Sequence, residues 1–535
     1  MDRPLRIDFV LHSDGYVKMF EPTLRLLAAR GHAIRLVPDR RVEHDSWAMH
    51  LTSRLVADCP TISVQPLELG DEEHDWTRLF SDLSRSLDYV RYFEPRFARA
   101  TALRERAGRS APPTARRVMA GPLGRTRFGR AAVGAVLRMA LDATPTGPGV
   151  RAWLRGRRPD LLLLSPVVDG RRQPEFVRAA RALGIPTVAC VRSWDNLSTK
   201  GLFLEAPDRV TVWNETMRRE AVEMHHVPAD RVVTTGAQNF DVWFDRGPRL
   251  DREAFMRARG LDPERPLLLY LCSSKFISGP REPEWVARWL AAVRAHPAMD
   301  GIGVLVRPHP KSGEYWRDVD LGPNTAVYPP VGSETDTPQA QDVFYDSIHH
   351  AAAVVGVNTS ALIESAIIGR PVLSVLAPEF RNSQEDSIHF SYLRTVGGGA
   401  LVVDETLEGH VARLARVVEG TEAPPDTTPF VHEFVRPHGL DRPAAPILAE
   451  ALESTAELAV EPRPAPAWAA LLRPGLRLVA WEDARRSRID HHRAKVERRR
   501  RAKRWRRRAR LPLRWARLAY GIAASALSTS SRGDR

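Results

Sequence analysis

GVLVRPHP (303–310) and VVGVNTSALIESA (354–366) are the two segments that decide the fold of this chain. Each begins with a short apolar run and turns polar within a few residues. Short apolar runs bounded by such residues are typical of buried strands in a parallel sheet. Because polar residues directly follow both strands, we expect them at the carboxyl edge of one sheet, where ligands of open α/β sheets bind.

The same alternation of strands and helices extends on both sides of these segments. Strands are predicted at 5–11, 33–39, 160–166, 185–192, 209–214, 231–236, 266–274, 301–310, 352–358 and 370–376. Helical patterns lie between many of them, and this order predicts parallel, doubly wound sheets. A polar stretch around 245–265, with Pro248, Pro263 and the adjoining Pro266, separates two such sets.

The chain of 535 residues is too long for one core, so we expect two domains and an appendage. The predicted division is an N-terminal Rossmann-like domain at 1–245, with a basic insert at 106–150, a C-terminal Rossmann-like domain at 246–455, and a tail at 456–535. The insert reads as a loop or mobile helix because it is rich in Arg, Pro and Gly. The tail is first Pro/Ala-rich and then Arg-rich.

The net charge of +14 is concentrated in two segments. Residues 485–517 hold 17 basic residues and two acidic ones, and residues 106–141 hold eight arginines and no acid. Both segments therefore call for an anionic partner. Tryptophans among the arginines make an anionic membrane surface the preferred partner of residues 485–527. A solvated tail and nucleic acid remain the alternatives. The insert can meet the same surface or a lipid-linked pyrophosphate, or form a disordered basic loop.

Three widely spaced cysteines and ordinary proportions of apolar and charged residues exclude a disulfide scaffold and a fibrous chain. The N-terminus has no signal-peptide pattern, and no apolar run reaches the roughly 20 residues that span a bilayer. We therefore expect a cytoplasmic protein.

Arg307 and His309 follow the strand of the first segment two residues apart, so their side chains point to the same side. In the second segment Asn358, Thr359 and Ser360 precede a helix whose N-terminus would bind phosphate. Ordinary helix capping and contacts with a nearby loop are the alternatives.

Other candidates follow further strands. Glu364 stands one turn after Ser360 and can accept hydrogen bonds from ribose hydroxyls. Ser273, Ser274 and Lys275 would meet the same phosphates, unless they form a polar turn.

The first predicted domain offers candidates for a general base. His12 and Asp14 lie between a strand and a helix, where an imidazole or a carboxylate suits an acceptor hydroxyl. Asp195, beside Trp194, lies in a loop that suits a sugar or nucleotide. Capping and an Asx turn are the alternatives. There is no P-loop, HExxH, GxSxG or dinucleotide fingerprint, and no spacing typical of a metal site, so no metal and no cofactor is predicted.

These residues together resemble the GT-B glycosyltransferases. RPHP and the strand–NTS–helix–Glu element are most similar to the bacterial CDP-glycerol glycerophosphotransferases and capsular polysaccharide transferases, over roughly residues 5–420. The resemblance implies two doubly wound domains facing a cleft. It places Arg307 and His309 near the donor diphosphate or the transferred group. It places Thr359 and Ser360 on phosphate oxygens and Glu364 on the ribose. His12 or Asp14 would contact the acceptor.

The implied function is transfer from a nucleotide sugar or CDP-alcohol to a hydroxyl of a polymer or lipid-linked acceptor in envelope synthesis, at the inner face of the membrane. The motif usually reads aspartate-tyrosine-serine-serine where this chain has Val-Asn-Thr-Ser at 357–360, which favours a nucleotide sugar. A hydrolysing sugar epimerase of the same fold and a non-catalytic scaffold with a basic docking tail are the alternatives.

Overall fold

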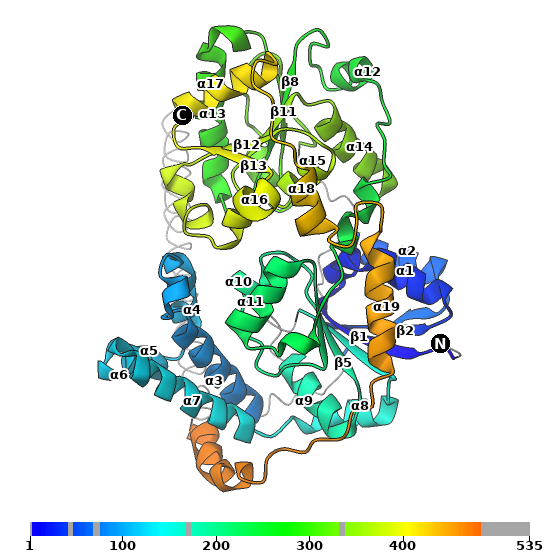
Figure 1. The fold of residues 1–535 in the computed structure, drawn as a ribbon, viewed down its shortest axis with the longest axis vertical. Coiled ribbons are helices and arrows are strands. Elements are labelled where there is room, and N and C mark those ends of the chain that lie inside the picture. Colours follow the sequence, from blue (N-terminus) through cyan, green and yellow to red (C-terminus); the bar gives the residue numbers. More distant parts are fainter. Residues whose placement is uncertain (1–2, 41–45, 68–74, 167–172, 331–336, 483–535) are drawn as a thin grey trace, which may run out of the picture.

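The computed structural model describes residues 3–40, 46–67, 75–166, 173–330 and 337–482. The basic tail at 485–527, predicted to dock on a membrane, lies outside these residues. Two parallel sheets, each in its own lobe, form the framework (Figure 1). Their strands are β1 Arg6–Ser13, β2 Ala33–Arg40, β3 Ile62–Val64, β4 Leu161–Ser165, β5 Thr187–Cys190, β6 Arg209–Val212 and β7 Val232–Thr234, then β8 Leu267–Leu271, β9 Gly303–Arg307, β10 Thr325–Val327, β11 Ala353–Gly356, β12 Val372–Val375 and β13 Leu401–Asp404.

Both sheets have the strand order of a Rossmann fold. The first sheet has the order β3-β2-β1-β4-β5-β6-β7 and the second β10-β9-β8-β11-β12-β13. All strands are parallel, and the order in which successive strands are added reverses beside β1 in the first sheet and beside β8 in the second. The predicted fold class, α/β and GT-B-like with two doubly wound Rossmann-like domains facing a cleft, is therefore confirmed. The prediction missed three short edge strands, β3, β10 and β13.

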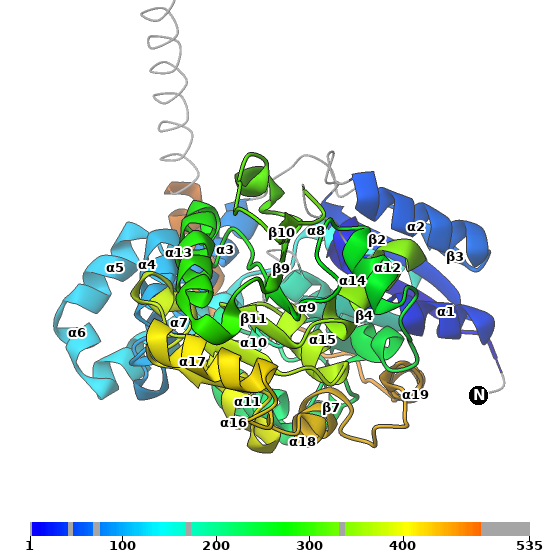
Figure 2. The ribbon, with the colours of Figure 1, turned by 90° about the horizontal axis from the view of Figure 1, so that it is seen from above.

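Helices cover both sheets (Figure 2). Those of the first lobe are α1 Glu21–Ala29, α2 Ser46–Asp58, α3 Asp75–Arg91, α4 Thr101–Ser110, α5 Pro113–Ala120, α6 Pro122–Arg125, α7 Arg127–Ala143, α8 Pro148–Arg157, α9 Gln173–Leu183, α10 Asn196–Thr199 and α11 Glu215–His225. The second lobe carries α12 Arg252–Arg257, α13 Glu282–Ala295, α14 Pro338–His349, α15 Ala361–Ile367, α16 Tyr392–Thr395, α17 Leu407–Val418 and α18 Thr428–Phe430, and α19 Ala444–Ala456 follows.

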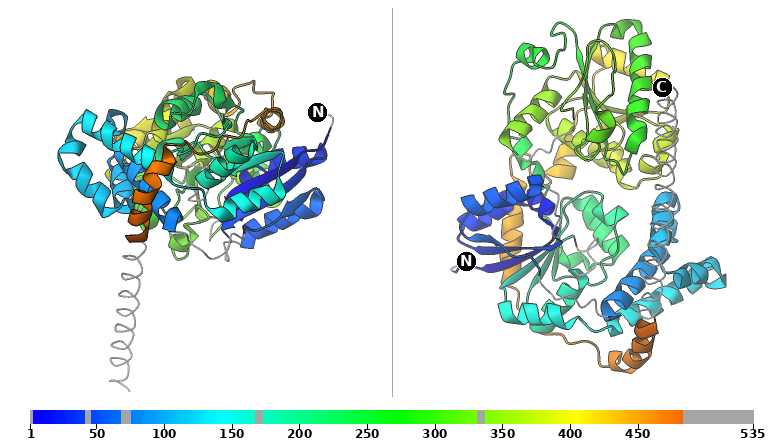
Figure 3. Two further views of the ribbon diagram at one scale, coloured as in Figure 1. Left: turned by 90° about the horizontal axis from the view of Figure 1, so that it is seen from below. Right: turned by 180° about the vertical axis from the view of Figure 1, so that it is seen from behind.

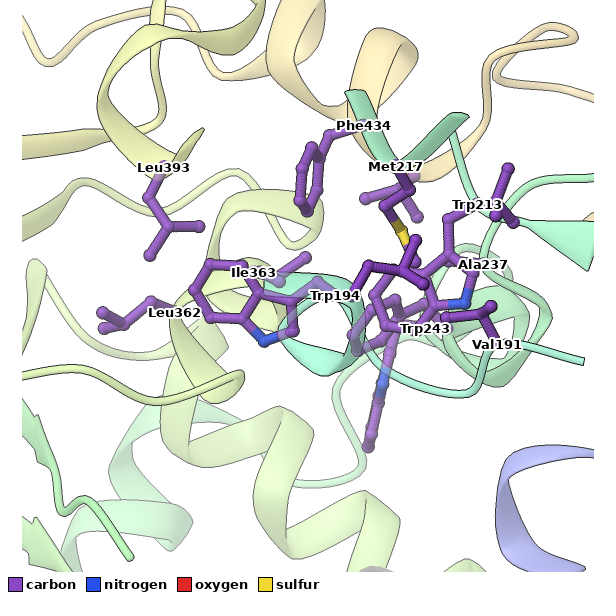
Figure 4. Packing of buried hydrophobic residues seen from close by; sticks show 14 of the residues in the cluster. Val191, Trp194, Trp213, Met217, Ala237, Trp243, Leu362, Ile363, Leu393 and Phe434 are labelled. Carbon is purple, nitrogen blue, oxygen red and sulfur yellow. The ribbon is translucent and has the colours of Figure 1, made fainter. Parts of the chain in front are cut away.

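One apolar core continues from the first lobe into the second. Trp194 of the first lobe meets Phe434 with ring centroids 6.2 Å apart, and Trp243 meets Phe344 at 5.3 Å. Figure 4 shows Trp194, Trp243 and Phe434 gathered with Leu362 at this junction. The shared core fixes how the carboxyl edges of the two sheets face each other.

One part of the predicted division, the placement of the segment before residue 455, differs from the structure. Helix α19, which we placed in the second domain, crosses back and packs on α1, with Leu448 and Leu452 in the core beneath the first sheet. The carboxylate of Asp241 accepts hydrogen bonds from the backbone N–H groups of Ala444 and Ala445 and thereby fixes the start of α19.

The basic insert is also different from the prediction of a loop or mobile helix. It folds into the ordered helices α4 to α7, which stand to one side of the first sheet (Figure 3). Helix α7 packs on α3 through Leu137 and Leu141, which meet Phe80 and Leu87. These leucines were present in the sequence, but the surrounding Arg, Pro and Gly obscured their helical spacing.

Candidate functional site

A cavity of about 940 Å³ lies between the two lobes, at the carboxyl edges of both sheets. The second lobe contributes the segment after β9 and the start of α15. The first lobe contributes the 3₁₀ helix at Asp14–Met19, the start of α1 and the loop after β5. The polar and charged residues that line it are Lys18, Glu21, Arg25, Arg54, Asp58, Arg192, Ser193, Asn239, Arg307, His309, Gln339, Gln341, Thr359, Ser360 and Glu364.

Arg307 is the most unusual charge in this cavity. It ends β9, pairs with Leu271 of β8, and is 5% exposed. Its guanidinium carbon lies 4.9 Å from the ring centroid of Phe344, and Nη1 and Nη2 have no hydrogen-bond partner among the described residues. Burial lowers the pKa of Arg307 to about 10, so the group is still a cation at neutral pH. An unpaired buried cation is costly, and an anion in the cavity would satisfy it.

His309 lines the same cavity as a neutral ring. Burial lowers its pKa to about 4, with a further contribution from the charges of Lys311 and Lys18. The backbone N–H of Lys311 donates to Nδ1 of His309 at 3.0 Å, so the ring proton belongs on Nε2. His309 therefore offers an N–H donor for an oxygen atom.

Thr359, Ser360 and Glu364 reach the cavity from α15, but not through conventional capping. Ser360 has helical backbone angles and no side-chain cap, and Thr359 Oγ1 accepts only a long 3.5 Å hydrogen bond from Ala361 N–H. Helix α15 has only seven residues, and the cavity that it reaches is also lined by the cations Lys18, Arg192 and Arg307. Burial raises the pKa of Glu364 to about 7, against the opposing effects of Lys18, Trp243 and Arg307.

Two cations of the first lobe were missed. Lys18 faces both His309 and Glu364 closely enough to lower their pKa values. The guanidinium carbon of Arg192 lies 4.0 Å from the ring centroid of Tyr16, and its Nε has no hydrogen-bond partner among the described residues. Lys18 follows β1 and Arg192 follows β5, and in these two loops we predicted the acids Asp14 and Asp195 as functional instead. The position of both cations shortly after a strand was the signal that could have identified them.

Ser273 and Asn358 are not brought to the cavity, although we predicted them as donor ligands. Ser273 is fully buried: its N–H donates to Glu282, and its Oγ accepts from Asn358 N–H at 3.3 Å. Asn358 Nδ2 donates to the Ser383 carbonyl at 2.5 Å. Their polar atoms join neighbouring loops at the sheet edge, which is the physical reason that they face inward.

Ser274 and Lys275 lie in the turn after β8 and do not line the cavity either. The Ser274 carbonyl accepts from the N–H groups of Ile277 and Ser278, as in a polar turn, and Lys275 is exposed. Their predicted contact with the donor stays a prediction.

The candidate bases lie outside the cavity lining. His12 packs beside Tyr16 at 5.6 Å between ring centroids, and Asp14 begins the 3₁₀ helix that carries Lys18. Asp195 Oδ1 accepts from Ser193 Oγ at 2.6 Å. Burial would raise the pKa of Asp195, but the nearby His389 and Lys200 lower it below its usual range. A hydrogen-bonded carboxylate of lowered pKa is a poor base, and this placement disfavours the catalytic role predicted for Asp195.

No group of three or more His, Cys, Asp or Glu side chains in the described ranges is arranged to hold a metal ion. Those ranges also contain no helix both long and apolar enough to span a membrane.

The sequence matches no protein-family profile and no curated protein sequence. Solved structures with a similar fold include a UDP-GlcNAc 2-epimerase from Methanocaldococcus jannaschii, at 10% identity over 84% of this chain and 100% of that chain, with a TM-score of 0.45. A putative UDP-N-acetylglucosamine 2-epimerase from Listeria monocytogenes has 11% identity over 86% and 98%, with a TM-score of 0.48. A glycosyltransferase from Rickettsia africae has 8% identity over 85% and 99%, with a TM-score of 0.44. Because these identities and TM-scores are low, the fold assignment rests on the strand order of this chain.

Proposed function

We propose that this protein is a glycosyltransferase, or a related phospho-alcohol transferase, that moves a group from a nucleotide-activated donor to a hydroxyl acceptor. The observation that carries the proposal is Arg307, a buried cation without a hydrogen-bond partner among the described residues, beside the Nε2–H of His309 in the interlobe cavity. A donor diphosphate supplies the oxygen atoms that both groups need.

The proposed chemistry is direct displacement: the acceptor hydroxyl oxygen bonds to the transferred group, the bond from that group to the donor diphosphate breaks, and the hydroxyl proton passes to a base of the first lobe, His12 or Asp14. As the bond to the donor diphosphate breaks, negative charge develops on its oxygens, and Arg307 and His309 stabilise that charge from the wall of the interlobe cavity. The hydroxyls of Thr359 and Ser360 add hydrogen bonds, and Glu364 accepts from the ribose. Since these groups are already in place, little reorganisation accompanies the reaction.

The acceptor would enter from the first lobe. We keep His12 and Asp14 as the proposed acceptor-facing residues, because the helix that begins at Asp14 carries Lys18 into the cavity. Closure of the lobes would bring that helix nearer to the donor and exclude water. A polymer or lipid-linked acceptor of the bacterial envelope, reached at the cytoplasmic face of the membrane, is the acceptor that we propose.

The second candidate is a nucleotide-sugar epimerase, which would use the same cations on the same diphosphate without an acceptor. A nucleotide sugar incubated with the protein alone distinguishes the two. A hydrolysing epimerase uses water to convert the donor into an epimeric free sugar and a nucleoside diphosphate, whereas a transferase consumes the donor rapidly only with an acceptor. A non-catalytic scaffold would leave the donor unchanged under both conditions.

Titration calorimetry with UDP-, GDP- and CDP-linked donors tests the proposal. We expect heat from at least one donor class, and loss of that heat in Arg307→Gln. Arg257→Gln is the control, because Arg257 is exposed and pairs with Glu253 on α12, outside the cavity lining. Absence of donor binding across all three classes would reject the transferase and the epimerase together.

A further inference from the structure

Helix α7 has two apolar faces, and only one of them is covered. Leu137 and Leu141 pack against α3. On another face Phe128 is 79% exposed, Val136 is 61% exposed and Met139 is also exposed. These three lie at i, i+8 and i+11, and alanines 132 and 135 extend the same stripe. A soluble helix normally turns a polar face to water, so this stripe calls for a covering partner.

A second helix, at 469–482, repeats the pattern. Trp468, just before it, and the residues at i+3, i+4, i+10 and i+11 are all apolar and exposed; they are Leu471, Leu472, Leu478 and Val479, with Leu471 82% and Leu478 69% exposed. Its inner side is small, with Ala469 and Ala480 buried. The two apolar stripes are therefore features of separate helices in distant parts of the sequence.

These helices lie next to each other. Arg473 Nε donates to the carbonyl of Ala143, the last residue of α7, at 3.2 Å. Figure 1 shows helix 469–482, in orange, beside the base of α3 and α7, and none of its residues lines the interlobe cavity. Helices α5 and α6 project from the same side of the lobe (Figure 3). We call α5 to α7 together with residues 468–482 the helical shoulder.

The charge around the apolar stripes is positive. Residues 106–141 contain no acid, and arginines are exposed on each helix, at 116 and 117 in α5, 125 in α6, and 127 and 138 in α7. Leu123 of α6 and Val118 of α5 are exposed among them. Exposed apolar side chains surrounded by arginines match the acyl boundary and the phosphates of an anionic lipid surface.

A cavity of about 410 Å³ between α3 and α7 supports a lipid partner. Its walls are mostly apolar and include Leu87, Val90 and Ala135, while Arg127, Arg130 and Arg138 stand along α7. Nucleic acid fits less well. Exposed Phe128 and Trp468 can stack on bases, but the exposed Leu, Val and Met side chains of the same surface outnumber them and contribute neither phosphate contacts nor stacking.

We propose that the helical shoulder is a membrane-docking surface that places its exposed apolar side chains in the interface of an anionic bilayer. It comprises residues other than those of the basic tail at 485–527 and of the donor cavity lining, and it does not depend on which group is transferred. It would hold the first lobe, and with it the acceptor side of the cavity, at the lipid surface.

Site-specific fluorescence on the full chain separates the shoulder from the tail. Phe128→Cys is labelled with an environment-sensitive nitrobenzoxadiazole dye in a Cys59→Ser background, since Cys190 and Cys272 are buried. Leu250→Cys, at an exposed site beside α12, is the matched control. On adding phosphatidylcholine vesicles containing phosphatidylglycerol, we expect a shift of emission to shorter wavelength at position 128 and none at position 250.

Vesicle sedimentation supplies the second measurement. Phe128→Ser combined with Val136→Ser should weaken the partition of the full chain to the same vesicles by about tenfold or more. The matched control, Val64→Ser combined with Leu250→Ser, removes two exposed apolar side chains elsewhere and should leave the partition unchanged.

Two results would overturn the proposal. Sedimentation of the chain with vesicles while the dye at position 128 keeps its aqueous emission would assign binding to the tail alone. A shift of that dye with single-stranded DNA but not with vesicles would assign the shoulder to nucleic acid. Because neither measurement uses a donor, failure here would leave the proposed transferase untouched.

Discussion

The backbone N–H of Lys311 donates to Nδ1 of His309 at 3.0 Å. This bond fixes the tautomer of a ring that lines the interlobe cavity and leaves Nε2–H as the donor available to a ligand. Together with a pKa lowered to about 4, it makes His309 a hydrogen-bond donor throughout the neutral range rather than a base that cycles its proton.

His309→Ala should lower turnover about 100-fold or more, the usual cost of one lost donor to developing negative charge. The free energy of unfolding should change far less, because the ring is only partly buried. His309→Gln keeps an N–H donor and should recover part of the rate. Wild-type turnover with a donor that binds, measured on His309→Ala, would contradict the assignment.

The same pKa gives a prediction about pH. Since the folded pKa of His309 is about 4, its ring stays neutral from pH 6 to 8. The pH–rate profile of the wild type should therefore show no inflection near pH 6.5 that is due to His309. Any inflection observed there should also be present in His309→Gln.

Arg307→Met should weaken donor binding by about 10- to 100-fold while leaving the melting temperature unchanged or raised. The variant removes the ligand for the diphosphate and also removes a buried cation whose Nη atoms are unsatisfied among the described residues. Arg370→Met is the matched control: Arg370 is a partly buried arginine of the same lobe, outside the cavity lining. Calorimetry and thermal unfolding check the pair, and equal loss of affinity in both variants would contradict the role of Arg307.

Glu364→Gln should change how stability depends on pH. The folded pKa of Glu364, about 7, lies above the ordinary value of 4.5 for a glutamate. Its contribution to folding stability is therefore fully present below about pH 4.5 and is lost as pH rises through 7. The variant should therefore gain about 1–3 kcal/mol relative to the wild type between pH 5 and 8. Urea unfolding at several pH values measures this difference in unfolding free energy. The contributions of the other buried acids cancel, because both proteins contain them.

Donor binding should respond to pH in the opposite sense to folding stability, increasing as Glu364 ionises. If Glu364 accepts hydrogen bonds from ribose hydroxyls, its ionised form binds better, and donor affinity should rise between pH 6 and 8 in the wild type but not in Glu364→Gln. A flat profile in both proteins would remove Glu364 from the ribose site.

Asn358 and Ser360 should separate stability from binding. Asn358→Ala leaves the buried Ser383 carbonyl without its donor and should cost about 1–3 kcal/mol of unfolding free energy with little loss of donor affinity. Ser360→Ala should show the reverse, because Ser360 is exposed, lines the cavity and makes no side-chain cap. Loss of donor binding in Asn358→Ala at unchanged stability would restore the role predicted from the sequence.

Tyr392→Phe should weaken the contact between lobes. The Tyr392 hydroxyl donates to Glu220 Oε1 at 2.6 Å, and burial has already raised the pKa of Glu220 to about 8. Removing the donor should cost about 1–3 kcal/mol at neutral pH. A double-mutant cycle with Glu220→Gln, read by urea unfolding, should give a coupling of at least about 0.5 kcal/mol, and additive effects would contradict the contact.

The sequence by itself determined the two sheets and most of their strands. Runs such as Leu161–Ser165 and Gly303–Arg307 are buried on both faces, and continuous apolar runs of this kind encode that burial locally. The position of Arg307, His309, Thr359, Ser360 and Glu364 after their strands also sufficed to bring them to one cavity, because parallel strands end at the same edge.

Tertiary structure alone decided which polar atoms face the ligand. Ser273 and Asn358 are small polar residues directly after a strand, as are Thr359 and Ser360, which line the cavity. Neighbouring loops, however, satisfy the hydrogen bonds of Ser273 and Asn358 inside the lobe. Whether Lys18 of one lobe reaches Glu364 of the other depends on the interlobe core around Trp194 and Phe434. The return of α19 to the first sheet is likewise non-local, since it rests on Asp241, about 200 residues before the helix that it holds. Local patterns specify strands and their ends, whereas partners distant in sequence determine which side chains are left free for chemistry.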